Sequence, residues 1–246
     1  MRRYEYRRIT RPSAANAPYN QMFRRLIVQT VALVAVMAAL LFVPAGTLAW
    51  PGAWAFLGEM AAGSVLIGGW LARHDPGLLA ERMSGLFQRE QPRGDKILMA
   101  VFLALVLAWL PLMALDAERY RLSHVPAWLQ SIGALALAML FVASFLVFRA
   151  NTYAAPAVKL QAQRGHRVVT EGPYAVVRHP MYAAAILYFL GTPLLLGSWW
   201  GLAFAPAFIA LLAVRAVMEE RMLTRALDGY PAYAARVRYR LVPFIW

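Results

Sequence analysis

Two segments in the C-terminal part of the chain carry side chains that could do chemistry. The first, residues 166–182, reads HRVVTEGPYAVVRHPMY and places Arg178 and His179 directly before Pro180. Proline is favoured in the first turn of a helix and restricts the preceding residue to an extended backbone. We therefore expect Arg178 and His179 at a helix N-terminus, where free N–H groups and the helix dipole favour a carboxylate or a phosphate.

The second segment, residues 215–246, begins with Arg215 and Glu219, which are four residues apart and so share one helix face, whereas Glu220 points elsewhere. As an exposed pair they would contribute only about 0.3–0.5 kcal/mol. The first segment could likewise be an interfacial loop whose arginine reaches to water. If a helical hairpin joins the two segments, they meet at one membrane face. They would then build a pocket with cationic, anionic and aromatic walls, which suits a zwitterionic, nucleoside-like cofactor.

The composition indicates the kind of protein that must position these segments. Of 246 residues, 61% are hydrophobic and 15% charged, and 25 Lys and Arg against 12 Asp and Glu give a net charge of +13. Soluble domains are roughly 45–50% apolar. The basic residues lie between long apolar runs, which is typical of membrane proteins and excludes nucleic acid as a partner. The absence of cysteine excludes thiol nucleophiles and cysteine-ligated zinc, and we predict no metal.

Apolar runs long enough to cross a bilayer predict the fold class: an all-α, polytopic transmembrane helical bundle with about six spans. The last two spans form a hairpin around Gly197 and Ser198, with kinks expected at Pro193 and Pro206. Glu59 lies at membrane depth without an assigned role. The predicted spans are residues 25–43, 53–72, 97–115, 127–148, 181–197 and 199–218.

The basic residues also predict the orientation of the bundle. With these spans, 23 of the 25 Lys and Arg fall on one side, and only Arg119 and Arg121 fall on the other. Cytoplasmic loops carry the excess of basic residues, so both termini are predicted to be cytoplasmic in a multi-pass membrane protein, in the inner membrane if the source is bacterial. The expected domains are a basic cytosolic arm (1–24), four transmembrane helices (25–148) and a catalytic region (149–246).

Residues 166–182, the Glu219–Glu220 pair and a tail with Tyr230, Tyr233, Val237 and Pro243 together resemble the isoprenylcysteine carboxyl methyltransferase family. The resemblance implies an integral membrane enzyme that uses S-adenosyl-L-methionine in a cytosolic pocket closed by the C-terminal segment. It also implies that Arg215 orients the acceptor carboxylate, and it leaves the role of Lys159 open. The implied cofactor-binding residues are His166, Arg167, Val168, Val169, Tyr174, His179, Pro180, Met181, Tyr182 and Glu219.

In such an enzyme an acceptor oxygen would attack the sulfonium methyl group, and positioning would carry the catalysis. Arg215 would hold the acceptor, and Arg178 or the helix N–H groups would hold the methionyl carboxylate. The partners are then the bilayer and a hydrophobic or lipidated acceptor that enters between helices. Isoprenylcysteine is the family's acceptor, while a phospholipid, a polyprenyl compound or a small hydrophobic acid also fits the sequence.

Two other classes of function stay open from the sequence. The tail is similar to that of NADPH-dependent sterol reductases, which implies hydride transfer, although those enzymes have more spans and a longer chain. A non-enzymatic permease or assembly factor would have no nucleotide pocket. The residues that carry the reductase similarity are Tyr233, Arg236, Val237, Tyr239, Arg240, Pro243 and Ile245.

Overall fold

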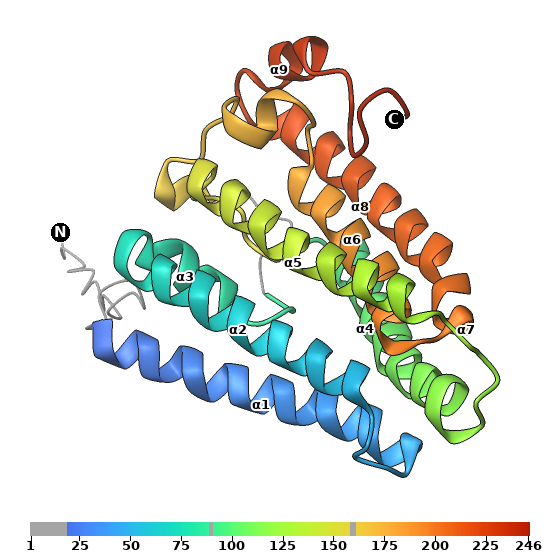
Figure 1. Ribbon diagram of the computed structural model, residues 1–246. Helices are drawn as coiled ribbons and strands as arrows, with labels where there is room; N and C mark the ends of the chain where they lie inside the picture. The colour runs from blue at the N-terminus through green and yellow to red at the C-terminus, as the bar shows by residue number, and fades with distance from the viewer. Residues whose placement is uncertain (1–18, 89–90, 158–160) are drawn as a thin grey trace, which may run out of the picture.

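A computed structural model describes residues 19–88, 91–157 and 161–246, and in this part of the chain every regular element is helical (Figure 1). Five candidate spans are long and apolar enough to cross a membrane. They are α1 (Tyr19–Ala45), α2 (Pro51–His74), α4 (Arg93–Ala114) with the π-helical turn η2 (Leu115–Arg119), α5 (Ala127–Ala150), and α7 (Trp199–Ala203) with α8 (Ala205–Ala226).

Shorter elements complete the bundle. They are the helices α3 (Pro76–Arg82), α6 (Pro180–Leu196) and α9 (Tyr230–Arg236), and the 3-10 turns η3 (Ala162–Arg164) and η4 (Gly172–Ala175).

The predicted polytopic helical bundle is confirmed, with differences in the C-terminal hairpin. The span predicted over residues 181–197 is α6, an apolar helix of 17 residues that is shorter than the other five. The last predicted span is two helices, because α7 ends at Ala203 and Pro206 lies in the first turn of α8. Pro193 lies inside α6 as expected. Helix α1 begins at Tyr19 rather than at residue 25, and residues 1–18 of the predicted arm lie outside the described part.

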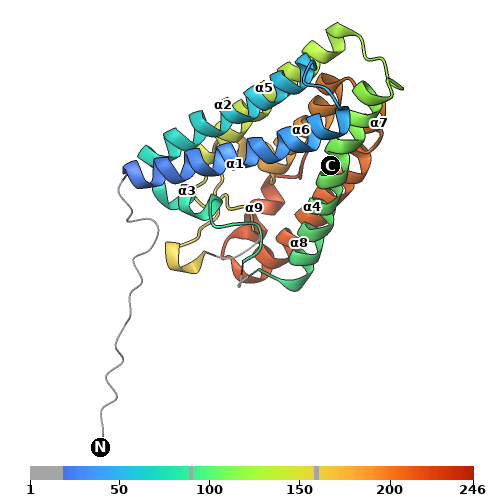
Figure 2. The same ribbon diagram turned by 90° about the horizontal axis from the view of Figure 1, so that it is seen from below.

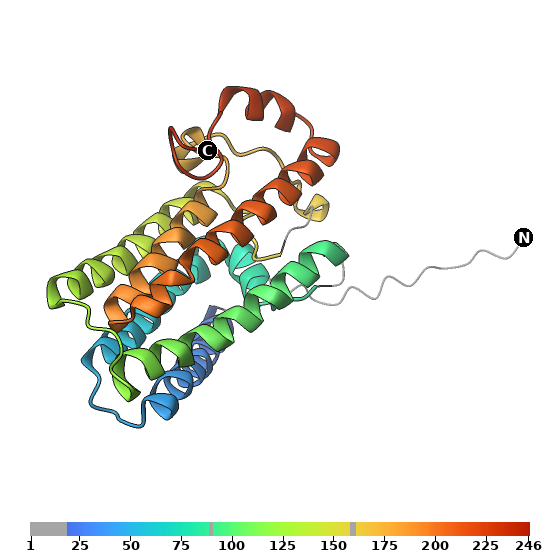
Figure 3. The ribbon, with the colours of Figure 1, turned by 90° about the vertical axis from the view of Figure 1, so that its right-hand side faces the viewer.

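Helix α6 runs through the middle of the bundle, where it packs on α5, α8, α2 and α4 (Figures 2 and 3). Its contact with α5 is a direct approach of two backbones at Gly133 and Gly191. A Cβ atom on Gly133 would lie 2.5 Å from the backbone nitrogen of Leu195 and 2.7 Å from the carbonyl oxygen of Gly191. Small residues allow such close packing of membrane helices. The end of α6 is thereby fixed beside the start of α5, and because the two helices pack antiparallel, the start of α6 lies beside the end of α5.

Aromatic side chains fill the core between α4, α6 and α8. The rings of Phe189 and Phe208 stack with centroids 4.3 Å apart, and Trp109 lies against both. The indole N–H of Trp109 donates a hydrogen bond of 2.8 Å to the carbonyl oxygen of Gly201, so this buried polar group has a partner. The α6–α8 hairpin is therefore anchored on α4.

At one end of the bundle, a buried carboxylate joins two connections between helices. Asp116 in η2 accepts hydrogen bonds from the hydroxyl groups of Ser123 and Ser198, at 2.6 and 2.5 Å. Ser198 also caps α7 by accepting the backbone N–H of Gly201 at 2.8 Å. At the other end, α3, the residues that follow α5, α9 and the C-terminal segment gather together (Figure 1). The polar side chains predicted to do chemistry lie at this second end.

Candidate functional site

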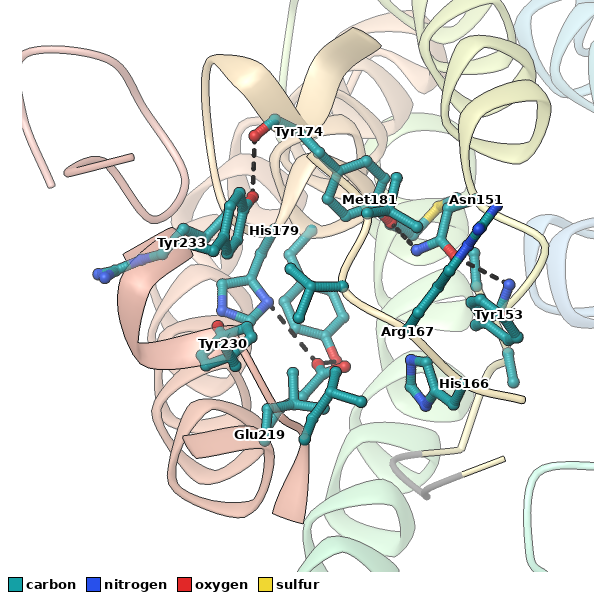
Figure 4. Close-up of a pocket in the computed structure, with 18 of the residues that line it drawn as sticks. Asn151, Tyr153, His166, Arg167, Tyr174, His179, Met181, Glu219, Tyr230 and Tyr233 are labelled. Atoms are coloured by element: carbon teal, nitrogen blue, oxygen red, sulfur yellow. Dashed lines mark hydrogen bonds and ion pairs between the residues drawn. The ribbon is translucent and has the colours of Figure 1, made fainter. Parts of the chain in front are cut away.

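A pocket of about 790 Å³, its open mouth included, lies between the start of α6, the end of α8, α9 and the chain that follows α5. Glu219, His179, Tyr230 and Tyr233 form one wall in Figure 4, and Asn151, Tyr153, His166 and Arg167 form the opposite one. The remaining lining residues are Ala154, Ala155, Ala157, Val168, Val169, Tyr174, Arg178, Met181, Tyr182, Leu223 and Leu227.

Most of the residues predicted from the sequence thus meet around one pocket. Two of them do not line it. Pro180 is buried as the first residue of α6, and Arg215 lies beyond the pocket wall. Lys159 lies outside the described residues. The predicted lining residues found together are His166, Arg167, Val168, Val169, Tyr174, Arg178, His179, Met181, Tyr182 and Glu219.

His179 stands between the two glutamates at the end of α8. Its Nδ1 lies 3.7 Å from Oε2 of Glu219, and its Nε2 lies 3.2 Å from Oε1 of Glu220. Its ring stacks on that of Tyr182, at an interplanar angle of 7°. The hydroxyl of Tyr182 in turn donates a hydrogen bond of 2.7 Å to Oε2 of Glu219. Glu219 is therefore held in place from two sides while it still faces the pocket.

The start of α6 differs from the expected anion site, because other parts of the chain already bind the groups that would hold the anion. The backbone N–H groups of Arg178 and His179 donate to the carbonyl oxygens of Tyr239 and Arg240, both at 2.9 Å, so the C-terminal segment occupies these donors. The guanidinium of Arg178 pairs with Glu220, with Nε 2.9 Å from Oε1. Sequence reasoning missed this because the tail carries no periodic signal that shows where it folds back.

Glu220 is the second feature that the sequence interpretation missed. It points away from the face of Glu219, as expected, but it lies within 3.2 Å of Arg178, His179 and Arg240 at once. One carboxylate thus joins the last turns of α8 to the start of α6 and to the C-terminal segment. Two features of the sequence could have indicated this role of Glu220: the adjacent Glu219 and the run of arginines in the tail.

Arg215 lies one turn before Glu219 and points toward α4. Its Nε lies 2.9 Å from Oδ1 of Asp95, and its Nη2 donates to the carbonyl oxygen of Pro156 at 2.5 Å. Its Cζ lies 5.6 Å from the ring centroid of Tyr182, which separates it from the pocket. Arg215 therefore joins α4, α8 and the loop that forms the pocket wall.

The wall formed by residues 151–157 is supported from α2 and α3. Asp75, the N-cap of α3, accepts a hydrogen bond from the hydroxyl of Thr152 and pairs with Arg164. Arg82 donates to the carbonyl oxygen of Ala154 at 3.0 Å, and its guanidinium lies over the ring of Phe148. Burial lowers the pKa of Arg82 to about 10, which leaves it charged at neutral pH. The segment between α2 and α4, which contains α3, thus supports the pocket wall that follows α5.

Four polar lining residues were not predicted as site residues: Asn151, Tyr153, Tyr230 and Tyr233. Asn151 donates to the hydroxyl of Tyr174 at 2.7 Å, and the hydroxyl of Tyr233 donates to the carbonyl oxygen of Tyr174 at 2.8 Å. Tyr230 is buried, and its hydroxyl has no hydrogen-bond partner within the described residues. Burial raises the pKa of Tyr233 to about 12 and that of Tyr230 further, so both stay neutral donors.

His166 contributes a neutral ring to the pocket. Its ring centroid lies 4.5 Å from that of Tyr153, and its Nδ1 accepts the backbone N–H of Gln161 at 3.4 Å. Burial lowers the pKa of His166, with a smaller opposing effect from Glu219. An unprotonated Nδ1 agrees with both observations. In the described part of the chain, no group of three or more His, Asp or Glu is placed to hold a metal ion.

Comparisons with known proteins cover the region that builds this site. Residues 128–228 match the model of the phospholipid methyltransferase family. Protein-S-isoprenylcysteine O-methyltransferase B of Arabidopsis thaliana is 33% identical over 90 residues, which are 36% of this chain and 45% of that protein. Protein-S-isoprenylcysteine O-methyltransferase of Schizosaccharomyces pombe is 34% identical over 82 residues, 32% of this chain and 35% of that protein.

The chain thus matches less than half the length of either relative. The match to the family model spans α5 to the end of α8, with the helices that carry Tyr182, Arg215 and Glu219. The resemblance predicted from the sequence is confirmed: the chain is similar to two protein-S-isoprenylcysteine O-methyltransferases and matches the phospholipid methyltransferase family model over residues 128–228.

Proposed function

We propose that the protein is an integral membrane methyltransferase that binds S-adenosylmethionine in the pocket and methylates a lipidic acceptor, with the carboxylate of an isoprenylcysteine as the first candidate. The observation that carries the proposal is the position of Glu219. It faces a pocket lined by aromatic rings, and Arg215, one turn away on the same helix, lines a separate apolar crevice.

The chemistry of the lining residues fits this cofactor. Tyrosine and histidine rings offer faces for an adenine and for a positively charged sulfur. Glu219 is an acceptor for ribose hydroxyls or an ammonium group. The buried Tyr230 hydroxyl, which lacks a partner within the described residues, is a donor that a bound carboxylate or purine nitrogen would satisfy.

When bound, S-adenosylmethionine supplies a methyl group whose bond to sulfur breaks as an acceptor oxygen takes the carbon, and the bonding electrons return to a neutral sulfur. A carboxylate acceptor needs no general base, so the chain's task is positioning. Tyr182 and His179 fix Glu219, and Glu219 fixes the cofactor. Arg178 acts through Glu220 by holding the C-terminal segment against the pocket, and Arg215 orients the acceptor.

The acceptor site we propose is the crevice between α4 and α8, two helices that run side by side in Figure 3. Its space is about 310 Å³, and all its lining residues except Arg215 are apolar. A hydrophobic tail in this crevice would place a polar head near Arg215. The lining residues are Leu98, Met99, Phe102, Leu211, Leu212 and Arg215.

The same arrangement would accept a phospholipid, and the matching family model favours this as the second candidate. The names of the two relatives favour isoprenylcysteine. We further propose that the pocket end of the bundle is cytoplasmic, because the loops at this end hold nearly all basic residues. Both termini then lie in the cytoplasm.

Calorimetric titration of the detergent-solubilised protein tests the cofactor. We expect S-adenosylhomocysteine to bind to the wild type and the affinity to fall about 10- to 100-fold in Glu219→Ala, because a hydrogen bond to a charged group is lost. The control variant Glu171→Ala alters an exposed carboxylate outside the pocket lining and should bind normally. Binding of NADPH alone would instead indicate hydride transfer, and binding of neither compound would indicate a non-enzymatic protein.

Transfer of a labelled methyl group then tests the acceptor. N-acetyl-S-farnesylcysteine and phosphatidylethanolamine vesicles are offered in parallel. A carboxyl methyl ester releases labelled methanol in base, whereas a methylated amine does not. Base-labile label on the farnesylcysteine supports the first candidate, and base-stable label on the phospholipid supports the second.

A further inference from the structure

A buried carboxylate on α4 holds the arginine of the proposed acceptor site. Asp95 lies in the first turn of α4 and is only 1% exposed. Its Oδ1 accepts from Nε of Arg215 at 2.9 Å, and its Oδ2 accepts from Nη2 at 3.3 Å. The two residues are 120 positions apart in the chain. Because a buried ion pair needs good geometry to offset its desolvation, this two-point contact fixes the guanidinium strongly.

The contact uses one particular edge of the guanidinium. Nε and Nη2 face Asp95, and Nη2 also donates to the carbonyl oxygen of Pro156. The hydrogen bonds that Arg215 makes with described residues use only Nε and Nη2, and Arg215 lines the apolar crevice. Nη1 therefore remains as the donor for a ligand in that crevice.

Asp95 is itself held in place. The amide of Gln91, a residue only 3% exposed, donates to Oδ2 of Asp95 at 2.6 Å. Gln91 precedes α4, so the connection that leads into this helix helps to determine where the carboxylate lies. A rigid carboxylate in turn restricts the rotamers of Arg215.

We propose that Asp95 is the positioning residue for Arg215, and that it makes the acceptor site selective for a head group that offers one oxygen to Nη1. The inference rests on the proposed function. The carboxylate of Asp95 occupies Nε and Nη2 of Arg215, so the acceptor binds through a hydrogen bond from the one nitrogen that remains. A bidentate pairing with the acceptor would require Asp95 to leave.

The test uses Asp95→Asn, Arg215→Gln and the double variant, with methyl transfer to N-acetyl-S-farnesylcysteine and binding of S-adenosylhomocysteine as separate readouts. We expect Asp95→Asn to raise the acceptor KM about 30-fold, the loss typical of breaking a buried charge pair, with kcat and cofactor affinity nearly unchanged. Arg215→Gln should do the same, and the double variant should be no worse than Arg215→Gln alone, because Asp95 acts through Arg215.

Two further variants separate positioning from folding. Asp116→Asn alters a comparably buried carboxylate at the opposite end of the same helical stretch and should leave the acceptor KM unchanged. Gln91→Leu keeps the ion pair but removes a bond to Asp95, and should raise the KM to a smaller extent. Additive effects of the two substitutions in the double variant would overturn the inference. It would also be overturned if Asp95→Asn and Gln91→Leu impaired KM, kcat and cofactor binding to the same extent. Absence of cofactor binding in the wild type would instead overturn the proposed function.

Discussion

Glu220 and Arg240 join the last helix of the bundle to the C-terminal segment. Oε2 of Glu220 accepts from Nε of Arg240 at 2.9 Å, while Oε1 of the same carboxylate lies 2.9 Å from Nε of Arg178. The backbone of Arg240 also accepts the N–H of His179. This link holds α9, and with it the wall that contains Tyr230, against the pocket.

We expect Glu220→Gln to loosen this segment. An amide keeps the size of the side chain but loses the charge that two arginines share, so the affinity for S-adenosylhomocysteine should fall about tenfold. Trypsin should cleave the C-terminal segment faster, because the backbone at Arg236, Arg238 and Arg240 is then held less firmly. Titration calorimetry and limited proteolysis measure the two effects.

The control for this variant is Arg225→Gln, which alters an exposed residue on the same helix. It should change neither cofactor affinity nor the rate of cleavage. If Glu220→Gln binds the cofactor like the wild type while its C-terminal segment is cleaved faster, the segment does not close the pocket.

The helices and their hairpin could be predicted because long apolar runs leave few alternatives in a membrane. The boundaries of α6 and the break between α7 and α8 could not, since they depend on Pro206, Ser198 and the distant carboxylate of Asp116. Residues such as His166 and Glu219 were found through local motifs. Asp95 was missed because it contacts Arg215 across 120 positions of the chain and no local pattern shows such a contact.

The two tyrosines of α9 should separate binding from stability. The Tyr230 hydroxyl has no partner within the described residues, so Tyr230→Phe should leave the thermal midpoint unchanged and weaken S-adenosylhomocysteine binding about tenfold. The Tyr233 hydroxyl donates to the carbonyl oxygen of Tyr174, so Tyr233→Phe should destabilise the fold by about 1 kcal/mol. Thermal unfolding and calorimetry of both variants provide the comparison, and equal effects on both quantities would contradict it.

The close approach of α5 and α6 should be sensitive to a single methyl group. A Cβ on Gly191 would lie 2.8 Å from the carbonyl oxygen of Gly133, which belongs to a helix backbone and cannot turn away. We expect Gly191→Ala to cost about 1–3 kcal/mol, the range typical of overpacked cores. Because the ends of these helices carry Asn151 and His179, cofactor affinity should fall as well.

Gly58→Ala is the matched control for this helix contact, since nothing lies within 4 Å of the added methyl group in α2. It should be neutral or slightly stabilising, because alanine favours a helix over glycine. Thermal unfolding in one detergent compares the two variants. A Gly191→Ala protein as stable as Gly58→Ala would show that the two backbones can separate without loss.

The neutral state of His166 predicts how cofactor binding depends on pH. Burial lowers its pKa below the usual value of about 6.5, so the ring is uncharged at neutral pH and takes up a proton only under more acidic conditions. Protonation would place a positive charge in the pocket that is proposed to hold a sulfonium. The affinity for S-adenosylmethionine should therefore fall more steeply on acidification than that for S-adenosylhomocysteine, whose sulfur is neutral. The folded state should also lose stability on acidification, since the unfolded chain binds this proton more readily.

His166→Asn keeps an acceptor for the backbone N–H of Gln161 but does not titrate in this range. Calorimetry at several pH values should show that the ratio of the two affinities changes with pH in the wild type and is constant in His166→Asn. All other groups near the pocket are the same in both proteins, so their contribution cancels in the comparison. A ratio that changes equally in the variant would place the responsible proton on another residue and would contradict the assignment of His166 as the neutral ring beside the sulfonium.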